Sequence, residues 1–406
     1  MKLLIHDLNE EEWTKAAEKY KGWRVITDNG TIRPCAGCFG CWIKTPGKCV
    51  IKDGYEYMGA LIHKADEVVV ISRYTYGGFS SFVKNVFDRS IGWVLPYFEI
   101  YEDEMHHKKR YPEEKPFTFI FRGGSFTEDE KRKARTYVEA VCRNFRAKVT
   151  DISFTEDEPL NTDESYTDSS RQSIEEEKAG NAGIDPNRII LLNASLRGDD
   201  ANSRKFLDRL AGSLGREPEL INLSSYLTRQ DELVQMLLSA GTLVLGMPLY
   251  ADGIPSQMLR LMESLEQSCQ NSEKNIYCVV NMGFYESHQI GNLLSMVRDW
   301  SDKCGFDYCG GLAIGAGEMM GMFMNPKSNA KGPGKNVTGG IDRLARAINT
   351  GSRIEDIYAD AYRFPRWLYM FAANLGWPKA GKKNGLKKKD LLRRIRTEKN
   401  RQKSAV

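Results

Sequence analysis

Four of the nine cysteines in this chain of 406 residues lie in one short segment. Cys35, Cys38, Cys41 and Cys49 follow the spacing C-x2-C-x2-C-x7-C, and the other five cysteines are scattered singly. Thiols so close in sequence can hold a metal, form disulfides or share a segment by chance. The chemistry of the segment therefore depends on the compartment of the protein and on the surrounding elements.

The first residues, MKLLIHDLNEEE, have only a short apolar stretch before they turn acidic, which is not the pattern of a signal peptide. No apolar run approaches the roughly 18 residues of a membrane span. We therefore expect a cytoplasmic protein without a transmembrane segment. Thiols stay reduced in that compartment, which disfavours disulfides.

Three alternatives stay open for the four thiols. A [4Fe–4S] cluster, which we favour, takes three ligands from C-x2-C-x2-C and a fourth from a more distant cysteine, here Cys49. A zinc ion is more often held by two separated C-x2-C pairs or by mixed cysteine and histidine ligands, and this segment contains no histidine. The third alternative is four unligated thiols. The remaining cysteines are expected to be core thiols: Cys142, Cys269, Cys278, Cys304 and Cys309.

The elements that must position these thiols alternate between strand and helix patterns. In the first half, strands are predicted at 2–8, 24–27, 67–72, 117–121 and 148–154, with helices at 80–92 and 128–145. In the second half, strands are predicted at 188–194, 218–223, 242–247, 275–282 and 308–315, with helices at 202–214, 231–239, 255–268 and 287–304. This alternation predicts an α/β fold with a doubly wound parallel sheet, used twice in tandem.

The predicted domains are 1–154, with the cysteine motif, and 188–350. An acidic Ser/Thr-rich stretch at 155–187 is interpreted as a linker, and 351–406 as an aromatic and basic extension. The halves also resemble each other, because 65–81 aligns with 240–256 without a gap. In doubly wound sheets, ligands bind near the carboxyl ends of the strands, where these turns fall.

An anion site is predicted where the first strand of the second half ends. The loop after that strand carries Ser195 and Arg197, and Asn202 or Ser203 is expected to cap the next helix. Free N–H groups at a helix start, hydroxyls and a guanidinium suit a phosphate. The corresponding loop of the first half holds Asp7 and Glu10 to Glu12, which would repel one.

The order of strand, phosphate loop and turns in the second half resembles that of the flavodoxin-like NAD(P)H-dependent FMN reductases. The cysteine loop resembles that of the iron–sulfur flavoproteins in that group. The features are the S-x-R…N-S loop, the P-x-Y turn at 248–250 and a later Gly-aromatic turn. The resemblance implies FMN bound in the second half. The residues it implies are Ser195, Arg197, Asn202 and Ser203 at the phosphate, and Pro248, Leu249, Tyr250, Ala251, Asp252, Gly253, Met282, Gly283 and Phe284 around the ring.

The implied activity is an oxidoreductase that takes hydride from NAD(P)H and passes electrons on, with a [4Fe–4S] cluster at Cys35, Cys38, Cys41 and Cys49 feeding one-electron acceptors. The acceptor would be a small molecule or a small protein, and no catalytic side chain can be named. The first half has the cysteine loop and the second half has the phosphate loop. Because one site would need both, we expect the halves to pack as a pseudo-dimer. The alternatives are a cluster-free quinone or FMN reductase and a redox-sensing scaffold.

Two further segments carry expectations. His106 and His107 are expected in a solvated loop, with a substrate pocket as the alternative. The aromatic stretch 364–377 is expected to pack on the two halves or on a second subunit, so a homo-oligomer stays open; a position on a bilayer surface or on another partner is the alternative. From Lys379 the chain is rich in Lys and Arg, but no nucleic-acid-binding pattern accompanies this charge, and we expect no nucleic-acid partner.

Overall fold

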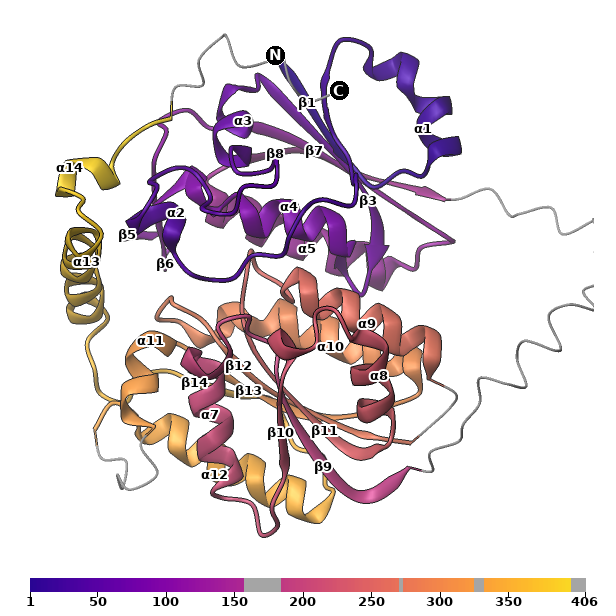
Figure 1. Cartoon of the computed structure of the whole chain (residues 1–406), viewed down its shortest axis with the longest axis vertical. Coiled ribbons are helices and arrows are strands. Elements are labelled where there is room, and N and C mark those ends of the chain that lie inside the picture. The colour runs from indigo at the N-terminus through magenta and orange to yellow at the C-terminus, as the bar shows by residue number, and fades with distance from the viewer. Residues whose placement is uncertain (157–183, 270–272, 325–331, 396–406) are drawn as a thin grey trace, which may run out of the picture.

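The computed structural model describes residues 1–156, 184–269, 273–324 and 332–395. Two α/β domains, each built on a sheet of parallel strands, lie one above the other. The first is in indigo and purple and the second in magenta and orange (Figure 1). The predicted fold class is confirmed. Most of the predicted linker lies outside the described residues, although 155–156 and 185–187 belong to strands.

The first sheet has a flavodoxin-like strand order of 2-1-3-4-5. Its parallel strands are, in spatial order, β2 (Arg24–Ile26), β1 (Lys2–His6), β3 (Glu67–Thr75), β7 (Pro116–Gly123) and β8 (Lys148–Glu156). Short β4 (Gly78–Phe79) pairs antiparallel with β3. One face is covered by α3 (Met58–Lys64), α4 (Ser81–Arg89) and α5 (Glu128–Phe145), and the other by α1 (Glu10–Ala16).

The second sheet repeats that order and adds a strand. Its parallel strands are β10 (Glu219–Asn222), β9 (Asp185–Asn193), β11 (Ala240–Pro248), β12 (Asn275–Asn281), β13 (Asp307–Ile314) and β14 (Ile357–Ala359). The helices α8 (Gln230–Leu238), α9 (Ser256–Ser268) and α10 (Gly291–Cys304) cover one face, and α7 (Asn202–Ala211) and α12 (Lys335–Thr350) the other. Because β14 belongs to this sheet, the second domain continues into the segment assigned to the extension.

The central strands of both sheets have continuous apolar runs, which is why the sequence predicted them as strands. The run EVVVIS in β3 and the run TLVLGM in β11 are apolar on both faces, as expected for parallel strands covered by helices on both sides. Both runs are almost completely buried. Four of the five cysteines predicted in the core are buried, and Cys269 is half-buried.

The domains pack through equivalent helices, so the predicted pseudo-dimer is confirmed. Helix α4 follows the third strand of its sheet and lies on α9, which follows the third strand of the other sheet. In the same way α5 lies on α10, and Lys133 Nζ of α5 lies 2.6 Å from Asp299 Oδ1 of α10. Figure 1 shows these helices facing each other between the two sheets.

Two additions to the first domain position the site. The antiparallel hairpin of β5 (Val94–Tyr101) and β6 (Glu104–Lys109) projects from the domain, and the short α2 (Gly40–Ile43) carries Cys41. The extension forms α13 (Arg366–Lys383) and α14 (Lys388–Leu391), which return from the second domain to lie on this hairpin (Figure 1). Within the described residues, no helix is both long enough and apolar enough to cross a membrane.

Candidate functional site

A cavity of about 390 Å³ lies between the two domains and collects most of the predicted site. Its volume is in the range of small-molecule sites. All four clustered cysteines line it, and so do twelve of the thirteen residues expected around FMN. The exception is Gly253, where a Cβ atom would come within 3.0 Å of the Tyr137 ring in the first domain. Gly253 therefore allows the domains to approach.

The loop after β9 is shaped by one buried side chain at the end of that strand. Asn193 Oδ1 accepts hydrogen bonds from Ser203 Oγ at 3.0 Å and from the Ser195 backbone N–H at 3.3 Å. Its amide nitrogen donates to the carbonyl of Gly198 at 2.9 Å. These bonds hold both serines at the cavity wall.

The start of α7 differs from the expectation that Asn202 or Ser203 caps it. The N-cap is Ala201, and no side chain of the described residues caps the helix. The first N–H groups of a helix have no partner within the helix. The reason for the difference is that the helix begins at Asn202, so Asn202 and Ser203 lie inside its first turn and not at the N-cap. The N–H groups at this helix start are left for a ligand.

Charges around this loop are partly compensated. Arg197 lines the cavity, and its guanidinium lies 3.3 Å from the carboxylate of Glu318 in α11 (Gly317–Met320). Asp199 forms an ion pair with Arg204 and accepts a hydrogen bond from Asn222 at 2.9 Å. Asp199 does not line the cavity, so it does not oppose an anion there.

The equivalent place in the first domain is filled by its own side chains. Asp7 accepts two hydrogen bonds from the backbone N–H of Arg73, at 3.0 and 3.1 Å. His6 stacks on Trp13 with ring centroids 4.5 Å apart. Helix α1 is closed by a capping box between Asn9 and Glu12. A side chain thus occupies a donor of this helix start, whereas α7 has no side-chain cap among the described residues.

The turn after β11 is held by the first domain. Lys84 of α4 is fully buried, pairs with Asp88, and donates from Nζ to the carbonyl of Tyr250 at 2.7 Å. Ala251 and Asp252 have φ angles of 38° and 59°, in the left-handed region that is costly for residues with a side chain. The interdomain contacts therefore support a strained turn at the cavity.

Gly37 lets the cysteine loop approach this turn. Its φ is 63°, and a Cβ atom there would lie 1.8 Å from the hydroxyl of Tyr250. Any residue other than glycine would separate the loop from the turn. Thus the prediction that packing brings the cysteine loop to the second half is confirmed by the shared cavity.

The four thiols line one cavity but form no single-ion site within the described residues. Cys41 lies within electrostatic range of Cys35, Cys38 and Cys49, and all four are free. Among the described residues, no group of three or more His, Cys, Asp or Glu side chains is arranged to hold a metal ion, so the zinc interpretation has no support here. The same finding lends no support to a cluster. Burial raises the pKa of Cys35 to about 12, with Asp88 adding to the shift.

A guanidinium lies beside these thiols. The Nε of Arg89 donates to Cys49 Sγ at 3.2 Å, and its terminal nitrogens form an ion pair with Asp53. The backbone N–H of Gly40 donates to Cys38 Sγ at 3.4 Å. A cation and a backbone N–H are thus directed at two of the four sulfur atoms.

Asp252 is linked to the surface by a series of polar contacts. Its Oδ1 accepts from the Asn144 amide at 2.5 Å, and Asn144 Oδ1 lies 2.6 Å from Nδ1 of His106. The other nitrogen of His106 lies 3.3 Å from Glu104, whose second oxygen is 2.7 Å from the exposed His288. The carboxyl of Asp252 is therefore held in one orientation at the cavity wall.

Burial controls the protonation of Asp252. It raises the pKa of this carboxyl to about 7, against the lowering effects of the Asn144 hydrogen bond and of Lys84. Four buried polar atoms of the cavity residues have no hydrogen-bond partner among the described residues: His107 Nδ1, Asp252 Oδ2, Asn281 Nδ2 and Trp377 Nε1. Buried polar groups are normally paired, so these atoms indicate a place for a polar ligand.

Comparisons with known proteins do not assign a family. No protein-family model matches the chain, and no curated protein matches it. The structure resembles the Trp repressor binding protein from Bacillus subtilis (15% identity, TM-score 0.26, covering 31% of this chain and 82% of that chain). It also resembles the azoreductase from Bacillus anthracis str. Sterne (13% identity, TM-score 0.30, 40% and 99%). Similarity at this level does not extend to what either protein binds.

Several cavity residues were not predicted from the sequence. The expectation of a solvated loop at His106 and His107 is wrong, because β6 buries His106 and places His107 against the rings of Trp42, Phe98 and Phe284. Helix α13 contributes further wall residues, among them Tyr369 and Trp377. The residues of β6, EMHHKK, do not alternate between buried and exposed positions, because Met105 and His106 are both buried, so no strand-like pattern revealed this wall.

Proposed function

We propose that the protein is an FMN-dependent oxidoreductase that accepts hydride from NAD(P)H and passes electrons to a second substrate. The observation that carries the proposal is the uncapped start of α7 beside Ser195, Ser203 and Arg197, facing a cavity with unpaired buried polar atoms. A phosphate is the anion that such a helix start suits. When bound, FMN supplies the ability to take two electrons as hydride and to release them singly or in pairs.

Different residues of the chain would bind the phosphate and the ring of this cofactor. Ser195, Arg197, Asn202 and Ser203 would bind its phosphate, and Pro248 to Asp252 would line the ring together with Met282, Gly283 and Phe284. Gly253 has no contact with the cavity and would act only through the packing of the domains. Asp252 holds a proton near neutral pH, because its pKa is raised to about 7. This proton is available at the cavity wall when charge develops there.

The phosphate assignment is tested by comparing FMN with riboflavin, which lacks the phosphate. We expect Arg197→Ala to weaken FMN binding by roughly 10- to 100-fold, because a charge-assisted hydrogen bond is removed. Riboflavin affinity should stay unchanged, measured by quenching of flavin fluorescence. Arg204→Ala is the matched control, since Arg204 pairs with Asp199 and Asp208 and does not line the cavity. Equal losses for both flavins, or no FMN binding by the wild type, would contradict the assignment.

The second part of the proposal is a [4Fe–4S] cluster on Cys35, Cys38, Cys41 and Cys49. It is supported by four free thiols on one cavity wall, with Arg89 and a backbone N–H directed at sulfur. In such a cluster each thiolate binds a different iron, so the ligands lie further apart than those of one ion. When bound, the cluster transfers one electron at a time.

Anaerobic purification followed by spectroscopy tests the cluster. We expect broad absorption near about 400 nm with stoichiometric iron and sulfide, lost in Cys49→Ser and kept in Cys269→Ser. The lack of a metal-holding group among the described residues favours a second candidate, a flavin reductase without a cluster. Flavin bands without iron or sulfide would establish that candidate and reject the cluster.

A further inference from the structure

Helix α13 has apolar side chains on two opposite sides. Toward the domains, the Tyr369 hydroxyl donates to the carbonyl of Gly283 at 2.6 Å, and Asn374 exchanges two hydrogen bonds with the backbone of Phe98. Away from them, Trp367, Phe371 and Leu375 are 65, 57 and 51% exposed. The first side is thus fixed on the protein, and the second has no partner in the described part of the chain.

The three exposed side chains form a continuous surface. Residues four positions apart lie on one face of a helix, so Trp367, Phe371 and Leu375 make what we call the apolar stripe. A helix that is apolar all round is normally buried all round. Three large neighbouring side chains in water are therefore unlike the single exposed apolar residues that most surfaces carry.

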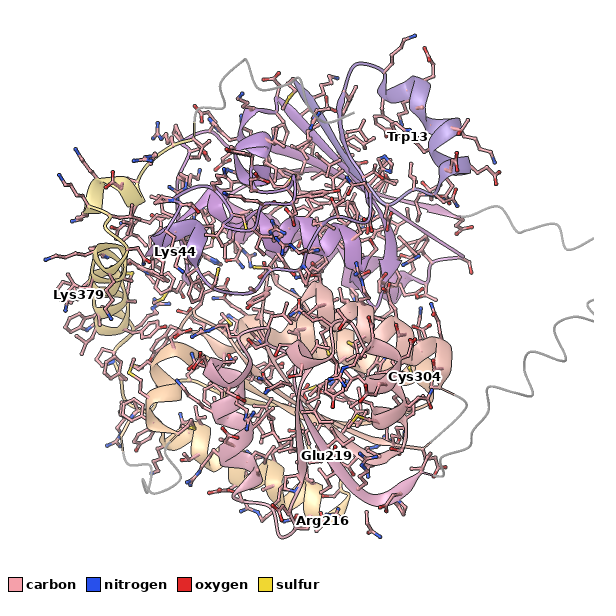
Figure 2. The ribbon with its side chains drawn as sticks, in the orientation of Figure 1. Trp13, Lys44, Arg216, Glu219, Cys304 and Lys379 are labelled. Atoms are coloured by element: carbon pink, nitrogen blue, oxygen red, sulfur yellow. The ribbon has the colours of Figure 1, made fainter. Side chains whose placement is uncertain are left out.

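Cations lie at both ends of the apolar stripe. Arg363 precedes it, and Lys379, Lys382 and Lys383 follow it, all of them exposed. Figure 2 shows Lys379 on the side of α13 that faces away from the two domains. The adjoining segment adds the exposed Lys387, Lys388 and Lys389. Any partner of the stripe must therefore accept positive charge at both of its ends.

This charge pattern selects among the possible partners. Two copies packed stripe against stripe would bring cations together in the parallel and in the antiparallel orientation. An anionic surface complements both ends at once, and α13 lies at the outer edge of the molecule, where a flat surface can reach it (Figure 1). Aromatic and aliphatic side chains flanked by lysines are the combination that binds the interface of an anionic bilayer.

We propose that the apolar stripe and its lysines bind the surface of an anionic lipid bilayer. The three apolar side chains would enter the interfacial region, and the lysines would contact the headgroups. This inference is independent of the proposed oxidoreductase function, because it uses no residue of the phosphate loop, the 248–253 turn or the cysteine loop.

Vesicle flotation of the full chain tests the proposal. We expect co-flotation with vesicles of phosphatidylcholine containing about a third phosphatidylglycerol, weakening as salt rises, and none with phosphatidylcholine alone. The triple variant Trp367→Ser, Phe371→Ser, Leu375→Ser should lower the partition coefficient by on the order of 100-fold. Its side chains are exposed, so the melting temperature should be unchanged.

A charge variant separates the two contributions. Lys382→Glu with Lys383→Glu should lower partitioning by on the order of 30-fold, since each lysine near an anionic surface contributes roughly a factor of five. Lys19→Glu with Lys21→Glu is the matched control, because these exposed lysines follow α1, on the other side of the molecule from α13 (Figure 1).

Three results would overturn the proposal. The first is a wild type that does not float with anionic vesicles. The second is flotation that the triple serine variant leaves unchanged. The third is a wild-type dimer in light scattering that becomes a monomer in the triple variant without any vesicle binding, which would assign the apolar stripe to a second copy of the chain.

Discussion

At the scale of single residues, the clearest functional feature is a carboxyl that keeps its proton near neutral pH. Asp252 is buried at the cavity wall, its turn is held by Lys84, and one of its oxygens is bound by Asn144. Because burial raises its pKa to about 7, the native state keeps a proton that the unfolded state releases near pH 4. Asp252 therefore destabilises the native state as pH rises through this interval.

This titration predicts a pH-dependent effect of Asp252→Asn. The amide keeps an oxygen for Asn144 but cannot ionise. Its free energy of unfolding relative to the wild type should rise from pH 4 to pH 7, by at most about 4 kcal/mol for a shift of three pKa units. Urea unfolding at pH 5 and pH 8 measures the difference. The exposed Asp231→Asn should show no such trend, and a constant offset for Asp252→Asn would contradict the assigned pKa.

At the scale of secondary-structure elements, two equivalent helix starts have different designs. In the first domain Asn9 and Glu12 close α1, whereas α7 begins at Ala201 without a side-chain cap. A side-chain cap contributes typically about 1 kcal/mol to stability. Helix α7 of the second domain lacks this stabilisation at the position where the proposed phosphate would bind.

The difference predicts a trade between stability and binding. Ala201→Ser places a hydroxyl at the N-cap, and should raise the free energy of unfolding of the apo protein by about 1 kcal/mol while weakening FMN binding. Asn9→Ala should lower stability by about 1 kcal/mol and leave FMN affinity unchanged. Thermal unfolding and flavin titration measure both. Tighter FMN binding by Ala201→Ser would show that the helix start does not hold the phosphate.

The same scale shows what the sequence could predict. Central strands such as β3 and β11 were found because burial on both faces leaves a continuous apolar run. The β5–β6 hairpin was missed because its buried polar residues have partners distant in sequence. Arg110, directly after β6, donates to the carbonyl of Leu391 at 2.9 Å, across most of the chain. No local pattern records such a pairing.

In the candidate site, too, some parts could be predicted from the sequence and others could not. The loop at Ser195 to Ser203 and the turn at 248–252 were predictable because strand ends in this fold collect ligands. The walls from β6 and α13 were not, since they reach the cavity only through tertiary packing. The cap at α7 was also mispredicted, because the helix begins at Asn202, so that Asn202 and Ser203 are its first two residues.

At the scale of the whole molecule, a buried ion pair joins the domains. Lys84 and Asp88 are fully buried in α4, and Asp88 accepts a hydrogen bond from the backbone N–H of Ser256 at the start of α9, at 3.0 Å. Removing one partner of a buried pair leaves a charge without compensation. The pair therefore makes the packing of the two domains sensitive to a single substitution.

Lys84→Met should lower the free energy of unfolding by about 3 to 5 kcal/mol. Adding Asp88→Asn should recover a large part of the loss, because the amide oxygen still accepts from Ser256 without a buried charge. Urea unfolding measures both variants. Lys131→Met is the control, since the Lys131–Glu128 pair is exposed and should change stability by less than about 1 kcal/mol. A double variant as unstable as Lys84→Met would show that the charge of Asp88 is not the cause.

The cavity draws its walls from the first domain, the second domain and α13, and this has a thermodynamic consequence. A molecule held there loses its binding site when either domain melts, so its binding energy is added to the stability of both. Calorimetry of the empty protein can resolve two heat-absorption peaks, one for each domain. Saturation with ligand should merge them into one cooperative peak, because binding would then add a further link to the packing of α4 on α9 and of α5 on α10.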